Sequence, residues 1–196
     1  MMINTIPLFT INVYKITIKD WSEKHRDRLL DLVPKESSRR LVQPGQWTDS
    51  MDYTDYHAWS NQGVEKPPYY DGLVEVLKPY LEEFFSSGNY KSSYQKTGTT
   101  QIHEVWCQRY KSGDYHSPHD HGSIGYSAVL YAKLDPDVHR STEFYMPFPT
   151  EQGSKRSQSL MVEEGDLVIF PAHLLHMAPP HCSEDKIRVI FSFNFF

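Results

Sequence analysis

The sequence predicts a mainly β protein whose helices pack against the outside of a strand-built core. Beyond Gly98 the chain contains several short runs of strand-forming residues, separated by Gly, Pro, Asp and Ser. Before Gly98 it contains two stretches with helical spacing. Aromatic residues make up 14% of the chain, which also favours a β-rich core. We therefore expect one domain over 1–196, in which 1–97 form a strand, helices and a lid loop and 98–196 form the core.

Periodicity predicts the individual elements. Residues 9–18 alternate and are rich in β-branched side chains, which indicates a strand. Asp20 stands three residues before Glu23, as in a capping box, and apolar residues follow at helical spacing, so we expect a helix over 20–33. Residues 69–85 show a second apolar helix face. The strands expected after it are 99–110, 123–134, 142–148, 159–163, 167–170, 174–177 and 187–196.

Composition and charge argue against several classes of protein. A formal net charge of −5 gives no support for a nucleic-acid-binding surface, which is usually basic. Cys107 and Cys182 are too few for a disulfide framework, which favours a reducing environment. The N-terminus lacks the pattern of a signal peptide, and the chain lacks the run of about 18 apolar residues that a membrane span needs. We therefore expect a cytoplasmic protein.

The main chemical signal is the segment Tyr-His-Ser-Pro-His-Asp-His at residues 115–121. His119 and His121 are two residues apart, so on a β-strand both imidazoles point to the same face and can bind one metal ion. The flanking Pro118 and Gly122 are equally compatible with two polar residues in a surface turn. The pair alone therefore leaves both readings open.

A third histidine, His176, follows the apolar stretch 167–170 after a break at Pro171. One reading is a core histidine whose ring bonds a neighbouring carbonyl group. However, a His-x-His pair with one distant histidine is the ligand spacing typical of metal sites in double-stranded β-helix proteins. Imidazole suits iron, zinc, copper and nickel. Together with His119 and His121, His176 therefore predicts a transition-metal site.

Arg188 lies in the last predicted strand. Alternation places Arg188 and Ser192 on one face of this strand and Phe191 and Phe193 on the opposite face. A guanidinium that faces the interior of a barrel is costly unless an anion meets it. Its planar fork binds a carboxylate by two hydrogen bonds. The alternative is an exposed arginine on an edge strand.

Several motifs together resemble a known family. They are Ile-His-Glu-Val-Trp (102–106), Gly-Asp-Tyr-His-Ser-Pro-His-Asp-His (113–121), Ser-Ala-Val-Leu-Tyr (127–131), Gly-Asp-Leu-Val-Ile-Phe-Pro (165–171) with His176, and 188–194. In these stretches the C-terminal half of the chain resembles the iron(II)- and 2-oxoglutarate-dependent oxygenases of marine bacteria and cyanophages, whereas the N-terminal half matches only in its layout. The resemblance implies a double-stranded β-helix, a jelly-roll or cupin-like barrel with the N-terminal helices outside it. It also admits a phage protein in the cytoplasm of its host.

The resemblance also implies roles for individual residues. His119 and His176 correspond to iron ligands, and Arg188 corresponds to the residue that binds the far carboxylate of the cosubstrate 2-oxoglutarate. Tyr131 and Ser192 are further candidates for contacting that carboxylate.

His121 departs from the superfamily pattern, because most members have Asp or Glu at this position. A site with two histidines and one carboxylate is usual for non-haem iron oxygenases. Three neutral imidazoles leave iron with its full +2 charge until the dianionic cosubstrate binds.

We therefore expect a dioxygenase that uses iron(II), 2-oxoglutarate and O₂ to hydroxylate a small-molecule or peptidyl substrate, with release of succinate and CO₂. The loop 37–68, rich in Trp and Tyr, is expected to border the metal cleft and to wall a substrate pocket. His116 and His173 are candidates for groups beside the metal or the substrate. The histidines given no functional role, because they lie in polar or loop contexts, are His25, His57, His139 and His181.

Two alternatives belong to other classes. The first is a cupin-type metal-binding protein, or a dioxygenase that does not use 2-oxoglutarate. Its Gly and Pro punctuation fits, but residues 123–126 lack the glutamate that cupins usually place after the histidine pair. The second is a structural jelly roll, such as a virion component with surface histidines. No nucleic-acid or membrane partner is expected.

Overall fold

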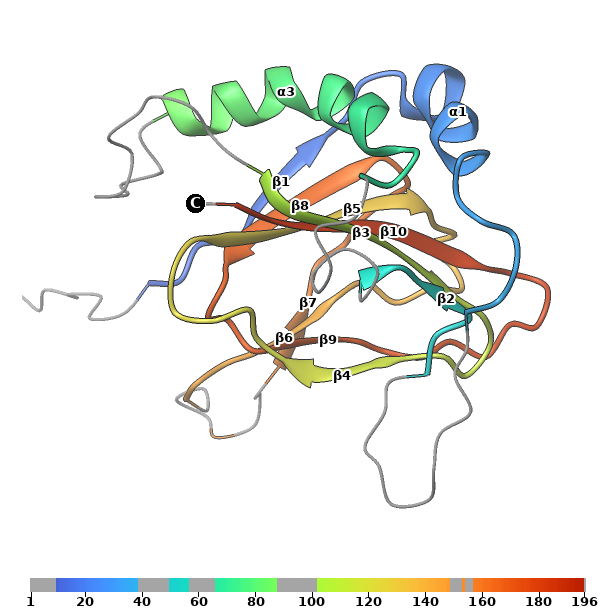
Figure 1. Cartoon of the computed structure of the whole chain (residues 1–196). Helices are drawn as coiled ribbons and strands as arrows, with labels where there is room; N and C mark the ends of the chain where they lie inside the picture. The colour runs from blue at the N-terminus through green and yellow to red at the C-terminus, as the bar shows by residue number, and fades with distance from the viewer. Residues whose placement is uncertain are drawn as a thin grey trace, which may run out of the picture.

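The computed structural model describes residues 10–38, 50–56, 66–87, 102–148, 153 and 157–195. Its strands form two antiparallel sheets with few helices (Figure 1). In chain order the elements are β1 (Tyr14–Thr17), the π-helical turn η1 (Trp21–His25), α1 (Arg26–Leu30), β2 (Tyr53–Thr54), α3 (Tyr70–Ser86), β3 (Ile102–Tyr110), β4 (His116–His119), β5 (Tyr126–Lys133), β6 (Glu143–Tyr145), β7 (Ser157–Ser159), β8 (Asp166–Pro171), β9 (His176–Ala178) and β10 (Arg188–Phe195).

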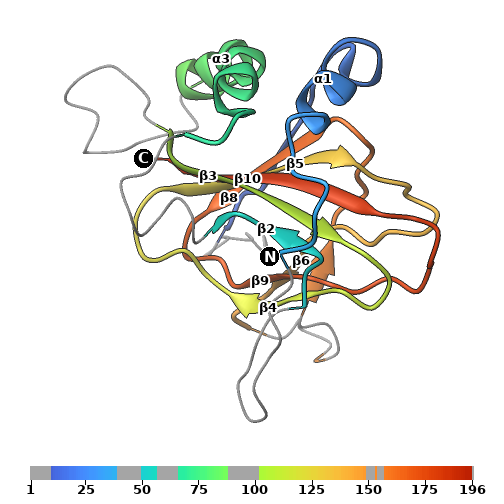
Figure 2. The ribbon, with the colours of Figure 1, turned by 45° about the vertical axis from the view of Figure 1, so that its right-hand side comes forward.

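The two sheets lie in separate layers. The larger sheet has the strand order β1-β8-β5-β10-β3-β2, and the smaller has the order β4-β9-β6-β7. Strand β10 lies between β5 and β3, so that Ser192 stands opposite Val129 on one side and Trp106 on the other. In Figures 1 and 2 the helices lie on one side of the larger sheet and the smaller sheet lies on the other. The mainly β architecture predicted from the sequence is confirmed.

Alternation along β10 separates two cores, as the sequence predicted. Phe191, Phe193 and Phe195 are fully buried in a core that includes Leu73 and Leu77 of α3. On the opposite face, Ile190 belongs to a second core that contains residues of both sheets. Arg188 and Ser192 share this second face and are both buried. The polar residues of β10 therefore point into the space between the sheets.

The predicted capping box at Asp20 is wrong. Asp20 has a left-handed backbone (φ 53°) and makes no side-chain cap hydrogen bond. Its carboxylate instead accepts a hydrogen bond from the ammonium group of Lys24 at 2.6 Å. This bond takes the place of the one from a backbone N–H that a capping box requires. The predicted helix 20–33 is likewise shorter, a π-helical turn followed by five α-helical residues.

No helix among the described residues is long and apolar enough to cross a membrane.

Gly165 allows the first helical segment to dock on the larger sheet. Its φ of +89° favours glycine, and a Cβ atom at this position would lie 2.7 Å from the Cβ of Trp21. The Trp21 indole is buried and donates a hydrogen bond to the Ala132 carbonyl at 3.0 Å. The glycine therefore makes room for an aromatic residue that ties the helical segment to β5.

Three strands differ from the sequence prediction. The strand expected at 159–163 is found at Ser157–Ser159, and strands β2 and β4 were not predicted. Strand β4 contains Pro118, which interrupts a strand pattern. Pro118 is tolerated because β4 is at the edge of the smaller sheet, where one side of the strand has no neighbour that needs a hydrogen bond from the missing backbone N–H.

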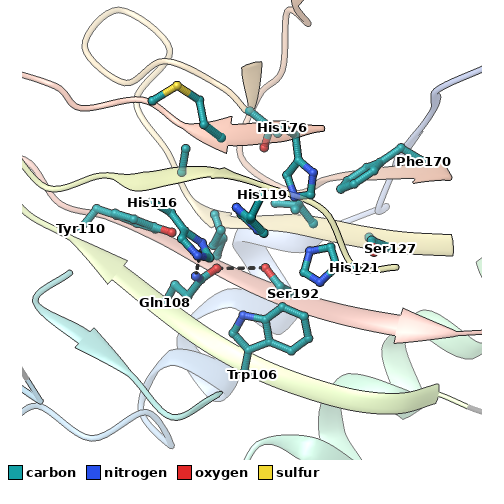
Figure 3. A pocket seen from close by; sticks show the side chains of 16 residues that line it. Trp106, Gln108, Tyr110, His116, His119, His121, Ser127, Phe170, His176 and Ser192 are labelled. Carbon is teal, nitrogen blue, oxygen red and sulfur yellow. Dashed lines mark hydrogen bonds between the residues drawn. The ribbon is translucent and has the colours of Figure 1, made fainter. Parts of the chain in front are cut away.

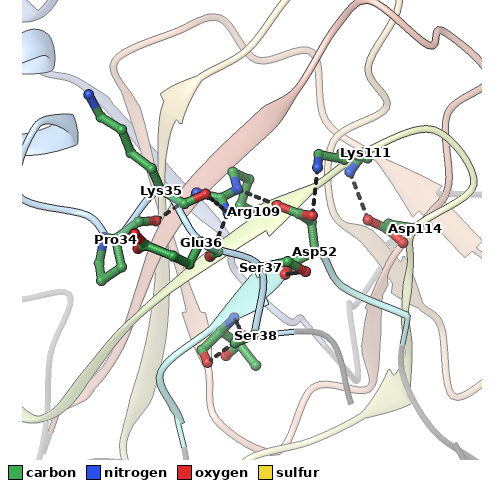
Figure 4. A network of polar contacts seen from close by, with 10 residues as sticks. Pro34, Lys35, Glu36, Ser37, Ser38, Asp52, Arg109, Lys111 and Asp114 are labelled. Atoms are coloured by element: carbon green, nitrogen blue, oxygen red, sulfur yellow. Dashed lines mark hydrogen bonds and ion pairs between the residues drawn. The ribbon is translucent and has the colours of Figure 1, made fainter. Parts of the chain in front are cut away.

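A polar network fastens the chain before and after residues 39–49 to β3 (Figure 4). Arg109 bonds the Asp52 carboxylate through Nε and the carbonyl groups of Pro34, Lys35 and Glu36 through its other nitrogens. Burial alone would raise the pKa of Asp52, but hydrogen bonds from Lys111 and Arg109 outweigh it and hold the pKa below its ordinary value. The network therefore contains an ionised carboxylate that fixes residues near the opening of the site.

Candidate metal centre

Three histidines from two strands and a loop meet between the sheets (Figure 3). His119 ends β4 and pairs in register with His176, the first residue of β9. His121 follows β4, where its backbone N–H donates to the Ala172 carbonyl at 2.8 Å. The candidate ligand atoms of the three rings lie within 4.8 Å of one another. The structure thus brings together the three residues that the sequence selected, as a group that could hold a metal ion.

Hydrogen bonds define the tautomers of two of these rings. Nδ1 of His119 lies 2.7 Å from the Ser117 carbonyl oxygen, and Nδ1 of His176 lies 2.8 Å from that of Leu174. A carbonyl can only accept, so each Nδ1 carries the proton and each Nε2 keeps its lone pair. In both cases the carbonyl belongs to the residue two positions earlier.

The site keeps its imidazoles neutral. Burial, followed by the nearby His119, lowers the pKa of His121 to about 4 and that of His176 to about 3. At neutral pH both rings are therefore uncharged, and their lone pairs are available to a metal.

Two carboxylates that could replace His121 as a ligand have other partners. Asp120 accepts a hydrogen bond from the backbone N–H of Gly122. Glu143 of β6 pairs with Arg140 and accepts a hydrogen bond from Ser157. Among the described residues, the group that could hold a metal around His119 contains histidines alone.

The wall of the cavity beside the histidines carries an organised set of polar groups. Gln108 accepts a hydrogen bond from Ser192 at 3.2 Å and donates one to Nδ1 of His116 at 3.0 Å. The His116 ring stacks on that of His119 with 3.8 Å between centroids. His173, the other candidate for a neighbouring group, is exposed instead.

Sequence reasoning missed Gln108, although a signal existed. Gln108 is two residues from Trp106 on β3, and both line the cavity. The period of two that was applied to β10 would have placed them on one face.

Arg188 is buried beside this cavity. Its exposed fraction is 1%, and Nη1 donates to the Arg140 carbonyl at 2.5 Å. Its guanidinium carbon lies 4.4 Å from the ring centre of Tyr110, which lines the cavity. Burial lowers the pKa of Arg188, yet arginine remains charged in proteins. Nε and Nη2 have no hydrogen-bond partner among the described residues, so part of a buried cation is available to an anion.

Tyr131 is buried next to the same region, and its hydroxyl is already paired. It donates to Oγ1 of Thr142 at 2.9 Å and accepts from the backbone N–H of that residue at 2.9 Å. Thr142 itself lines the cavity. The sequence reasoning that selected Tyr131 had therefore missed Thr142, which belongs to a segment without a strong period.

The described part of the predicted lid loop borders the cleft. Met51, Thr54 and Tyr56 line an opening together with Trp106 and the histidine segment. The Tyr56 and Trp106 rings meet edge to face with 5.0 Å between centroids. Of the other aromatic residues in 37–68, Tyr53 is buried in the hydrophobic core instead, and Trp47 and Trp59 lie outside the described residues.

Comparisons with known proteins agree with this geometry. Residues 104–194 match the family model described as "Putative 2OG-Fe(II) oxygenase". No curated protein matches the chain.

Several solved structures share the fold at low sequence identity. The viral collagen prolyl hydroxylase of Paramecium Bursaria Chlorella virus-1 is 16% identical, with a TM-score of 0.56 over 93% of this chain and 94% of that one. A Pseudomonas putida prolyl-4-hydroxylase is 14% identical, with a TM-score of 0.56 over 95% and 93%. HygX from Streptomyces hygroscopicus, solved with nickel, 2-oxoglutarate and hygromycin B, is 15% identical, with a TM-score of 0.56 over 95% and 83%.

The match covers 91 of the 196 residues and includes all three histidines of the cluster, and it agrees with the shared fold. The chain is a 2-oxoglutarate- and iron(II)-dependent dioxygenase.

Proposed function

We propose that His119, His121 and His176 hold iron(II) through their ring nitrogens, and that Arg188 receives the far carboxylate of 2-oxoglutarate. One observation carries this proposal. A buried guanidinium with two nitrogens that lack a hydrogen-bond partner among the described residues packs on Tyr110, which lines the same cavity into which the three imidazoles converge. When bound, the metal and cosubstrate supply O₂ activation, with hydroxylation of the substrate and release of succinate and CO₂.

The surrounding residues would orient the cosubstrate. The hydroxyl of Ser192 lies on the Arg188 face of β10, and Gln108 holds it in place. We propose that Ser192 and Tyr131 contact the same carboxylate as Arg188, for which their hydroxyl protons would turn from Gln108 and Thr142 to the ligand. The carbonyl groups of Ser117 and Leu174 would hold the imidazole ligands in the tautomer that leaves Nε2 free.

The finer assignment is also part of the proposal. The quoted motifs support an oxygenase of the marine bacterial and cyanophage type, built as one domain over 1–196. Residues 98–196 would form the double-stranded β-helix, and the helices of 1–97 would pack outside it. The protein would act in the cytoplasm, of a bacterium or of a phage-infected host, without nucleic-acid or membrane partners.

The substrate would be a small molecule or a peptidyl group. The opening beside the histidines is lined by Met51, Tyr56 and Trp106, which offer apolar and aromatic surface, and by the carboxylate of Asp120. Rigid aromatic walls bury ligand area at little cost in side-chain entropy. Two similar structures are prolyl hydroxylases, which makes peptidyl proline a sensible first member of a substrate panel.

The proposal is tested by succinate formation from 2-oxoglutarate in the presence of iron(II) and O₂, with and without candidate substrates. We expect metal-dependent succinate formation in the parent protein and its loss in His119→Ala and His176→Ala. His173→Ala is the matched control, because His173 is exposed, and should behave like the parent. Metal binding without any consumption of 2-oxoglutarate would instead favour the cupin-type alternative.

A further inference from the structure

Two histidines that the sequence placed in polar or loop contexts are buried next to Arg188. His139 and His181 expose only 5% and 3% of their surface. Their rings meet edge to face, with 4.5 Å between centroids. His139 precedes β6, and His181 lies between β9 and β10. His139 follows His121 by 18 residues, and His181 follows His176 by five.

A hydrogen bond to the backbone joins the guanidinium to the segment that carries His139. The Arg188 Nη1 atom donates to the carbonyl of Arg140, the residue next to His139. The positive charge of Arg188 is one of the causes that lower the pKa of both histidines, after burial as the largest cause. Arg188 and both histidines are buried, and the bond to Arg140 places the guanidinium next to the segment that carries the ring pair.

A turn defines the tautomer of His139. The backbone N–H of Asp135 donates to Nδ1 of His139 at 2.9 Å, and the backbone N–H of His139 donates back to the Asp135 carbonyl at 2.8 Å. Nδ1 is thus an acceptor, and the neutral ring carries its proton on Nε2. The pKa of His139 is lowered to about 4, so this neutral tautomer is present at neutral pH.

The proton on Nε2 of His139 has no acceptor. Nε2 is buried and lacks a hydrogen-bond partner among the described residues, as do Nε and Nη2 of Arg188. Both nitrogens of His181 are also buried and lack a hydrogen-bond partner among the described residues. Burial lowers the pKa of His181, and the nearby backbone of Tyr110 opposes this effect. Unpaired buried donors cost folding free energy, which points to an anionic acceptor that completes the site.

The carboxylates of this region have other partners. Asp135 pairs with Lys186 at 2.9 Å. Asp114 accepts hydrogen bonds from Ser50 and from the backbone of Lys111, each at 2.8 Å. These carboxylates are therefore engaged elsewhere, which favours a bound anion as the acceptor for His139 and Arg188.

We propose that His139 is a further hydrogen-bond donor to the far carboxylate of the 2-oxo acid, acting through Nε2–H beside the Arg188 fork. His181 is a positioning residue that packs on the His139 ring. This inference rests on the proposed function, since it assumes that Arg188 binds the cosubstrate. It assigns selectivity for dicarboxylic over monocarboxylic 2-oxo acids to a histidine–arginine pair, so that the carboxylate is held from two sides.

The test compares two ligands that share the chelating end. Zinc-loaded protein, which does not turn over, is titrated calorimetrically with 2-oxoglutarate and with pyruvate, which lacks the far carboxylate. His139→Leu should weaken 2-oxoglutarate binding about tenfold or more, because a hydrogen bond to a charged group is lost. Its pyruvate affinity should match that of the parent. His139→Gln, which can restore an N–H donor, should recover part of the loss.

Controls separate the possible failures. Equal weakening for both ligands in His139→Leu, or no weakening for either, would overturn the role of His139. If Arg188→Ala also fails to change the ratio of the two affinities, the carboxylate assignment in the proposed function falls as well. His181→Phe keeps the edge-to-face packing and should change the ratio less than threefold, whereas a loss as large as that in His139→Leu would make His181 a donor and overturn its positioning role.

Discussion

At the scale of single residues, the chemistry of the site depends on neutral groups beside one buried cation. The imidazoles of His121 and His176 are uncharged because burial depresses their pKa values. Arg188 is the buried cation in this region, and Tyr110 covers one face of its guanidinium. A dianion with one end on a divalent metal and the other on Arg188 would reduce the charge at the metal from +2 to +1 and neutralise the guanidinium.

Substitution of Arg188 provides the most direct test at this scale. Arg188→Ala should raise the KM for 2-oxoglutarate by about tenfold or more, because a charge-assisted hydrogen bond contributes roughly 1.5–3 kcal/mol and each 1.4 kcal/mol is a factor of ten. Arg188→Lys should recover only part of this, since an ammonium group lacks the planar fork. Steady-state succinate formation measures KM, and metal affinity should stay close to that of the parent. An unchanged KM in Arg188→Ala would contradict the assignment.

At the scale of elements, the strands were easier to predict from sequence than the loops. Alternation identified the two faces of β10 because both are buried, one against Leu73 and Leu77 of α3 and the other between the sheets. The prediction of a capping box at Asp20 was wrong because the spacing of Asp20 and Glu23 does not reveal the left-handed backbone at Asp20 or the bond from Lys24 to its carboxylate. His139 and His181 escaped notice because their burial arises only when two distant loops meet Arg188, and no periodic pattern marks such a meeting.

Two glycines offer a matched comparison at the element scale. Gly165 and Gly113 both have positive φ, but an added Cβ meets Trp21 at 2.7 Å only at Gly165, while nothing lies within 4 Å at Gly113. Left-handed backbone costs a non-glycine residue roughly 1–2 kcal/mol at either position, and overpacking adds roughly 1–3 kcal/mol at Gly165 alone. Gly165→Ala should therefore lower the free energy of unfolding by more than Gly113→Ala. Urea denaturation measures both, and equal losses would show that Trp21 moves aside freely.

At the scale of the whole molecule, buried histidines couple stability to pH. His121 and His139 have pKa values lowered from 6.5 to about 4, and His176 from 6.5 to about 3, with burial as the largest cause in each case. Between these values and 6.5 the unfolded chain binds more protons than the folded one. Stability is therefore complete above about pH 6.5 and decreases as the pH falls toward 4.

The metal-free protein should accordingly unfold at lower urea concentration at pH 5 than at pH 7.5, and His139→Gln should show a shallower dependence. Zinc at pH 7.5 should raise stability further by binding the folded state alone, by about 2.7 kcal/mol at a free concentration one hundred times the Kd. A midpoint independent of pH over this range would mean that the imidazoles are not held neutral by burial.

The polar network on β3 has a consequence for engineering. Arg109 holds the carbonyl groups of Pro34, Lys35 and Glu36, while its partner Asp52 follows residues 39–49 in the chain. Ser38 also bonds Asp52 through its backbone and Thr54 through its side chain. The separation between the two attachment points is thus set by β3 rather than by the residues that connect them. We therefore expect that segments of other lengths and compositions can be exchanged between these anchors while the three histidines keep their places.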